Sequence, residues 1–262
     1  MSNVIIIGGG AAGMMAAITA ARNNNKVTLI EKNEKLGKKL FITGKGRCNI
    51  TNACDMDTLF DSVITNSKFL YSSFYGYTNQ DVIDFFENIG VQTKTERGER
   101  VFPQSDHSSD VIATLQRTLK NKGVTVRLHT KAEHLEIEEG KVRGVKTSNG
   151  TTCPADAVII ATGGYSYQTT GSTGDGYRFA KKSGHTIAPL SPSLVPMTVK
   201  EDYCMQMQGL SLKNVEVKIK DGKKVLFEEF GEMLFTHFGV SGPLILSASL
   251  SLIHISEPTR RR

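Results

Sequence analysis

The sequence predicts an α/β fold, with a parallel sheet that begins near the N-terminus and a second, mainly antiparallel β-rich part inserted into it. Three observations predict this class. The first 31 residues follow the order strand, glycine-rich turn, helix, strand. A short apolar run at 157–160 also ends in glycines, which fits a strand that returns to the same sheet. Beyond Pro189, strand patterns at 215–220 and 225–230 predict an antiparallel pair.

The first strand is expected over the continuously apolar, β-branched run from Val4 to Ile7, which is typical of a strand buried on both faces. A glycine-rich turn at 8–13 leads into an alanine-rich helix, which we expect to end at the three asparagines 23–25. A second strand follows at 27–31. The sequence therefore predicts a parallel β-α-β unit with a short loop after its first strand.

The glycines of this turn each have a distinct expected role. Gly8 permits the tight turn, Gly10 lets the backbone approach a pyrophosphate, and Gly13 lets helix and strand pack closely. Free N–H groups at the start of the helix favour an anion. Glu31, which ends the second strand, can accept hydrogen bonds from an adenosine ribose. The unit predicts a dinucleotide site, with a purely structural glycine turn as the alternative; the site would also include Ala11, Ala12 and Lys32.

Composition narrows the classes of function. The 262 residues carry a net charge of +6, but the chain has no tryptophan and no basic run interleaved with aromatic residues, which argues against a nucleic-acid partner. Its four cysteines are scattered, without the spacing of a zinc site, and indicate a reducing compartment. No apolar stretch is long and uniform enough to cross a bilayer. We therefore expect a cytoplasmic protein with a small-molecule substrate and no metal.

The segment 36–52 contains a Gly-Lys-Gly-Arg-Cys-Asn run that resembles the BaiN-like (YhiN-like) flavoproteins, an FAD-dependent family that contains bile-acid enone reductases and an aminoacetone oxidase. The resemblance implies a Rossmann-like FAD-binding domain of the glutathione-reductase type. It also implies that the run itself binds FAD, through Gly44, Gly46, Arg47, Cys48 and Asn49. A flexible basic turn is the alternative for these residues. A redox pair of Cys48 with Cys54 is disfavoured, because its spacing does not match that of the flavin disulfide reductases.

The same resemblance implies further contacts along the chain. By this resemblance Ala132 would contact the adenine. Independently of it, the returning strand would present Ala161, Thr162, Gly163 and Gly164 at its carboxyl end, where ligands of open α/β sheets bind. Asp175 begins a helix expected beside the flavin, although helix capping alone would account for this residue. His237 lies in a motif of the second domain and could face the substrate; a structural histidine is the alternative.

The expected domains are an FAD-binding domain over 1–190 and the start of the inserted β-rich domain over 191–250. Residues 251–262 look like a non-native tail, similar to translated sequencing adaptor. The family's fold closes with a further C-terminal segment, so by resemblance the fold is incomplete at its C-terminus. Because a missing closing segment leaves an unpaired sheet edge, we expect these 262 residues to bind FAD weakly or to aggregate.

The predicted function is that of an FAD-dependent oxidoreductase. NAD(P)H is the expected electron donor, and a small conjugated carbonyl compound is the expected acceptor. Arg47 and His237 are the candidate catalytic residues. Three alternatives remain: a flavin amine oxidase that uses dioxygen, a flavin-dependent RNA-modifying protein, and an inactive fragment. The sequence does not indicate the oligomeric state.

Overall fold

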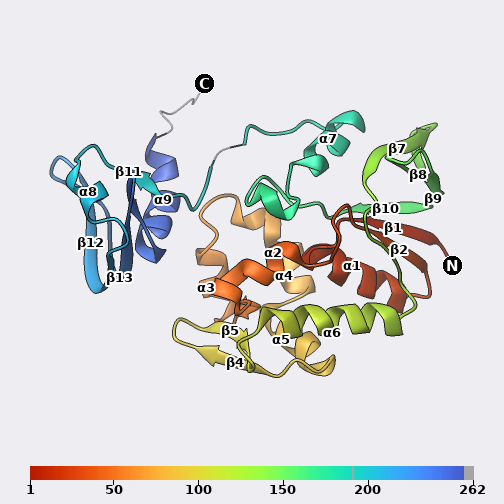
Figure 1. The fold of residues 1–262 in the computed structure, drawn as a ribbon, viewed down its shortest axis with the longest axis horizontal. Helices are drawn as coiled ribbons and strands as arrows, with labels where there is room; N and C mark the ends of the chain where they lie inside the picture. The colour runs from red at the N-terminus through yellow and green to blue at the C-terminus, as the bar shows by residue number, and fades with distance from the viewer. Residues whose placement is uncertain (191, 257–262) are drawn as a thin grey trace. The chain divides into compact units, whose positions relative to one another are not determined.

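The computed structural model describes residues 1–190 and 192–256, together with the side chains of those residues up to 252. It divides into two compact units (Figure 1). The first unit comprises Met1–Leu59 and Lys68–Ile187, and the second comprises Phe60–Ser67 and the chain from Ala188 onward. Each unit is described by itself.

A four-stranded parallel sheet forms the centre of the first unit, as the sequence predicts. Its strands lie in the order β10 (Ala157–Ile160), β1 (Asn3–Ile7), β2 (Lys26–Ile30) and β6 (Thr125–Arg127). The register pairs Val4 of β1 with Val27 on one side and Ala157 on the other. Because β1 has a neighbour on each side and layers on both faces, its apolar run is buried from Val4 to Ile7.

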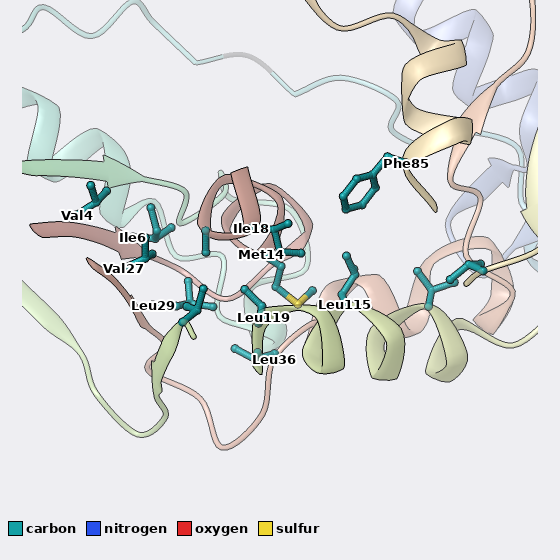
Figure 2. Close-up of a cluster of buried hydrophobic side chains, with 14 of the residues drawn as sticks. Val4, Ile6, Met14, Ile18, Val27, Leu29, Leu36, Phe85, Leu115 and Leu119 are labelled. Carbon is teal, nitrogen blue, oxygen red and sulfur yellow. The ribbon is translucent and has the colours of Figure 1, made fainter. Parts of the chain in front are cut away.

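Two helices cover one face of this sheet. They are α1 (Ala11–Arg22) and α6 (Ser108–Asn121). Figure 2 shows Met14 and Ile18 of α1 clustered with Leu115 and Leu119 of α6 over the side chain of Ile6. These side chains are almost completely buried, so the cluster fixes α1 against the sheet at the place where the helix begins.

An antiparallel meander packs on the other face. It contains β7 (Ala132–Glu138), β8 (Lys141–Thr147) and β9 (Thr152–Pro154). Ile5 and Ile7, which alternate with Val4 and Ile6 along β1, point into this second core together with Val145. At the outer edge of the parallel sheet, Ile159 and Ile160 of β10 are 39% and 38% exposed. An exposed apolar edge of this kind favours association with other chains.

The long connection between β2 and α6 combines short helices with a small sheet. The antiparallel sheet has the order β3 (Thr51–Asn52), β5 (Arg100–Pro103), β4 (Thr93–Glu96). A reciprocal capping box between Thr78 and Asp81 fixes the start of the helix α5 (Asn79–Asn88). The helices are α2 (Lys38–Ile42), a 3-10 turn at Thr43–Gly46, α3 (Met56–Asp61), a 3-10 turn at Ser67–Leu70, α4 (Tyr71–Gly76) and α5 (Asn79–Asn88).

After β10, the first unit continues through a 3-10 turn at Gln168–Thr170 to α7 (Asp175–Lys182). The second unit contains an antiparallel sheet in the order β11 (Met197–Thr198), β14 (Gly239–Ser241), β13 (Lys224–Thr236), β12 (Ser211–Asp221). Its helices are α8 (Tyr203–Gln206) and α9 (Pro243–Ser256). The expected tail at 251–262 therefore begins inside α9, and its last six residues lie outside the described chain. Among the described helices, none has the length and apolar character needed to span a membrane.

Candidate dinucleotide site

A cavity of about 310 Å³ lies in the first unit where three parallel strands end. Ligands of open α/β sheets bind at this carboxyl edge. The lining comes from the turns after β1, β2 and β10, from α2 and from the start of α7. Many of the lining residues are ones that the sequence predicts for cofactor binding: Gly8, Gly10, Ala11, Ala12, Glu31, Lys32, Ala132, Ala161, Thr162, Gly163 and Asp175.

Two of the three predicted glycines of the turn, Gly8 and Gly13, have a steric reason within the chain. Gly8 has a φ of +108°, and a Cβ there would lie 2.5 Å from the carbonyl oxygen of Ala161. A Cβ on Gly13 would lie 1.8 Å from the carbonyl oxygen of Gly8, so helix and strand meet without room for a methyl group. A Cβ on Gly10 would meet no atom within 4 Å. Gly8 and Gly13 therefore shape the turn, whereas Gly10 leaves open space at the cavity.

The start of α1 presents N–H groups to this space. Gly10 is the N-cap and has no side chain that could cap the helix. The first hydrogen bond of the helix runs from the N–H of Met14 to the carbonyl of Gly10. No acidic residue lies in the first turn, and Ala11 and Ala12 line the cavity. The unpaired N–H groups of a first helical turn attract an anion, so this end of the cavity suits a diphosphate.

Glu31 is buried, with only 7% of its surface exposed, and its carboxylate holds two strand ends together. One oxygen accepts a hydrogen bond from the N–H of Gly9 at 2.6 Å. The other accepts from the backbone N–H of Asn33 at 2.8 Å and from its Nδ2 at 2.7 Å. A carboxylate can accept about four hydrogen bonds, which leaves about one site for a ribose hydroxyl. Gly9 and Asn33, which also line the cavity, were not predicted.

Lys32 and Asp175 form an ion pair in the wall of the cavity. The Nζ of Lys32 lies 2.8 Å from Oδ2 of Asp175 and 2.7 Å from Oγ1 of Thr173. Burial alone would raise the pKa of Asp175, but hydrogen bonds and charge from Lys32, with further bonds from Arg178 and Thr173, outweigh it and hold the pKa below its ordinary value. Asp175 is therefore a carboxylate at neutral pH.

Three further lysines line the cavity, namely Lys38, Lys39 and Lys131. Lys38 pairs with Glu34 at 3.3 Å, and burial lowers the pKa of Lys39. None of the three was predicted as a site residue, although Lys38 and Lys39 lie in the segment 36–52 that resembles the flavoprotein family. With Lys32, four lysines face two carboxylates in this lining, a balance that suits an anionic ligand.

Thr162 supplies a polar group that has no partner among the described residues. Its Oγ1 is buried and unpaired, and Thr162 itself lines the cavity. Buried hydroxyls nearly always form hydrogen bonds, so an unpaired one beside a cavity fits a site that takes a polar ligand. Gly164 lies just outside the lining residues.

No residue of the predicted FAD-binding run at 44–49 lines the cavity, although Thr43, which directly precedes the run, does. Arg47 donates from Nε to Asp106 at 2.8 Å and from a terminal nitrogen to Asp106 and Glu96 at 2.6 and 2.5 Å. Its guanidinium also stacks 4.2 Å from the ring centroid of Phe102. Arg47 thus fixes the run on the β3–β5–β4 sheet.

The backbone of this run is left-handed at several positions, with φ of +57° at both Gly44 and Lys45, +86° at Gly46 and +62° at Cys48. Left-handed conformations cost little at glycine but are strained at Lys45 and Cys48. Cys48 is buried, which raises the pKa of its thiol despite a hydrogen bond with Thr43. Asn49 is exposed, and its side-chain amide bonds to the carbonyls of Val101 and Thr51. The four cysteines of the described chain are all free thiols.

His237 lies in the second unit, in the turn between β13 and β14. Its side chain is exposed and packs edge-on against Phe238 at 4.8 Å between ring centroids. The structure therefore does not bring His237 together with the cavity residues in one unit. Within the described part of the chain, no group of three or more His, Cys, Asp or Glu side chains is arranged to hold a metal ion.

Comparison with known proteins adds the family. Residues 2–251 match the HI0933-like protein Rossmann domain. The chain belongs to the HI0933-like family. Its curated relatives include a 3-dehydro-bile acid delta(4,6)-reductase of Clostridium scindens, 36% identical over 220 residues, which cover 83% of this chain and 52% of the relative. They also include a ribosomal RNA dihydrouridine synthase of Escherichia coli, 31% identical over 86% of this chain and 54% of the relative. This HI0933-like chain thus spans about half the length of the relatives it matches.

Solved structures support the same fold. A flavocytochrome c3 fumarate reductase superposes with a TM-score of 0.52 at 19% identity, covering 81% of this chain and 47% of the other. Mycobacterium smegmatis Sdh1 superposes with a TM-score of 0.54 at 22% identity, covering 70% and 39%. The predicted α/β, Rossmann-like FAD-binding fold and the predicted family are therefore confirmed. The exclusion of nucleic acid is not supported, because two relatives of this HI0933-like chain are named as ribosomal RNA enzymes.

Proposed function

We propose that this chain binds FAD in the cavity at the carboxyl edge of the parallel sheet and forms part of a flavin-dependent reductase. The observation that carries the proposal is the convergence on one cavity of the glycine turn, the uncapped start of α1 and the buried carboxylate of Glu31. This combination fits an extended dinucleotide better than a mononucleotide, because it offers separate places for a diphosphate and a ribose.

The residues present fit the parts of FAD. The N–H groups of Ala11 and Ala12 would hold the diphosphate, and Gly10 leaves the space in which it approaches. The remaining acceptor site of Glu31 would hold a ribose hydroxyl. Ala132, which is buried and lines the cavity at the start of β7, would contact the adenine. The unpaired hydroxyl of Thr162 would bond to a polar atom of the cofactor.

Bound FAD would supply hydride transfer, and the chain would supply binding, orientation and charge. Lys39 and Lys131 would offset the charge of the phosphates. The run at 44–49, held in a strained shape by Arg47, would bind the flavin portion, as the family resemblance implies. Arg47, predicted as catalytic, is proposed here as a positioning residue that holds this run, and the substrate contact of His237 stays a prediction from the sequence.

With FAD bound and NAD(P)H as the electron donor, the proposed reaction would be the reduction of a conjugated carbonyl compound, whose carbon–carbon double bond would gain a hydride and a proton. The bile-acid relative supports a small-molecule substrate of this class. A uracil base of RNA is the second candidate, favoured by two relatives that are named as ribosomal RNA dihydrouridine synthases. Both candidates contain a carbon–carbon double bond conjugated to a carbonyl group, so the same hydride chemistry serves either.

Anaerobic photometry of the 262-residue chain loaded with FAD tests this function. We expect NADH or NADPH to bleach the flavin band, and a conjugated enone to restore it. Restoration by ribosomal RNA instead would select the second candidate, and bleaching by an amine with restoration by dioxygen would identify an oxidase. Free FAD at the same concentration is one control. The variant Gly10→Val is the other, because it fills the open space at the start of α1 and should lose the flavin.

A further inference from the structure

The ion pair between Lys32 and Asp175 joins two segments that are 143 residues apart in the sequence. Lys32 lies two residues beyond the end of β2, and Asp175 begins α7. The two residues line the same cavity, and their side chains are 26% and 17% exposed. Arg178, one turn further along α7, contacts the other oxygen of Asp175 at 3.3 Å and donates to the carbonyl of Glu133 at 2.6 Å.

We propose that Lys32 is a positioning residue that clamps the glycine-rich turn 171–176 over the cavity and neutralises Asp175, so that the cavity can accept the diphosphate of FAD. The proposal rests on the proposed function. It assigns Lys32 a role toward the protein's own carboxylate instead of a direct bond to the cofactor, and it makes Asp175 the group whose charge must be masked.

The geometry of the turn supports a clamp. Besides the contact of Lys32 with Thr173, the Nδ2 of Asn33 donates to the carbonyl of Thr170 at 3.2 Å. Two consecutive side chains after β2 therefore hold the turn from both of its ends. Gly171, with a φ of +102°, allows this approach, because a Cβ there would lie 2.6 Å from Nδ2 of Asn33 and 3.3 Å from Cε of Lys32.

The charges that line the cavity support the proposed neutralisation of Asp175 by Lys32. Asp175 is one of two carboxylates in the lining, and Glu31, the other, already accepts three hydrogen bonds from N–H groups. Without Lys32, Asp175 would keep its hydrogen bond from Thr173 at 3.1 Å and its contact with Arg178 at 3.3 Å, but no lysine would offset its charge, which would repel the two phosphates. Two of the three N–H donors of Lys32 already point to protein atoms, at 2.8 and 2.7 Å.

A double-mutant cycle on the 262-residue chain tests this inference. The variants are Lys32→Met, which keeps most of the side chain but removes the charge, Asp175→Asn, and the two together. Lys218→Met is the matched control, because it also removes one lysine from a pair, with Glu228 at 2.7 Å, in the second unit. FAD affinity is measured by quenching of flavin fluorescence, and stability without FAD is measured by urea unfolding.

We expect Lys32→Met to weaken FAD binding about tenfold, which corresponds to about 1.4 kcal/mol. Asp175→Asn should bind FAD at least as tightly as the wild type. The double variant and the Lys218→Met control should each bind FAD within about threefold of the wild-type affinity. A double variant as weak as Lys32→Met would overturn the inference, since Lys32 would then act on the cofactor directly. An unchanged affinity in Lys32→Met would also overturn it.

The unfolding measurement separates this inference from the proposed function. If the wild-type chain binds no FAD, the proposed function fails, but the clamp still predicts that Lys32→Met destabilises the protein more when residue 175 is aspartate than when it is asparagine. Equal destabilisation in the two backgrounds would overturn the clamp.

Discussion

Replacing Gly13 by alanine would introduce a methyl group 1.8 Å from the carbonyl oxygen of Gly8. Contacts of a Cβ below 3.0 Å are essentially never seen, so the methyl group must move away by more than 1 Å. Gly8 cannot yield, because its N–H bonds to the carbonyl of Ile30 at 2.8 Å and its Cα faces the carbonyl of Ala161. The helix α1 must therefore move, and with it the fully buried side chains of Met14 and Ile18.

A shift of this size in a close-packed core costs about 3 kcal/mol or more. For a domain of this size that loss lowers the midpoint of thermal unfolding by roughly 6–12 °C. Urea and thermal unfolding without FAD, followed by circular dichroism, measure both quantities.

The matched control is Gly10→Ala, whose Cβ meets no atom within 4 Å and whose φ of −80° suits any residue. It should cost only about 0.5–1 kcal/mol, through the weaker N-cap. Its effect should instead be on FAD affinity, because the added methyl group lies at the start of α1. If Gly13→Ala were as stable as Gly10→Ala, the reasoning from the close approach of helix and strand would be refuted.

Two further predictions follow from the polar contacts of the first unit. Glu31→Gln should lose about 1–3 kcal/mol of stability, because one of the buried N–H groups of Gly9 and Asn33 would face an amide N–H. The affinity for FAD should fall as well. Unchanged urea unfolding and unchanged FAD titrations would contradict this prediction. Hydrogen bonds from Lys94 and Arg47 lower the pKa of Asp106 below its ordinary value of 3.8, so their stabilising effect is complete above that pH and is lost as the pH falls further. Arg47 also lowers the pKa of Glu96 below its ordinary value of 4.5. The stability difference between the wild type and Arg47→Met should therefore shrink as the pH falls below about 4.5, and a difference that stays constant down to about pH 2 would exclude this origin.

Local patterns in the sequence predicted the first β-α-β unit well. Three signals predicted it: the apolar run of β1, the spacing of Gly8, Gly10 and Gly13, and an acid at the end of β2. Each of these signals depends on only a few neighbouring residues. The structure adds steric reasons for Gly8 and Gly13 and shows open space at Gly10. It also places Glu31 as expected, at the edge of the cavity.

Long-range contacts of the site could not be predicted in this way. Arg47 meets Asp106, which is 59 residues away, and Lys32 meets Asp175 across 143 residues. Lysines and aspartates are common on surfaces, and no local spacing indicates which of them pair. The run that carried the family resemblance indicated a cofactor loop, but the ion pairs that hold Arg47 depend on β4 and on the turn after β5, whose positions only the fold determines.

Competition between FAD and its fragments tests most directly whether the diphosphate lies at the start of α1. In titrations of the 262-residue chain, ADP should displace FAD, and riboflavin, which lacks both phosphates and the adenosine, should bind far more weakly than FAD. Gly10→Val should abolish the binding of ADP and FAD while the chain remains folded. Riboflavin that binds as tightly as FAD, together with ADP that does not compete, would contradict the account.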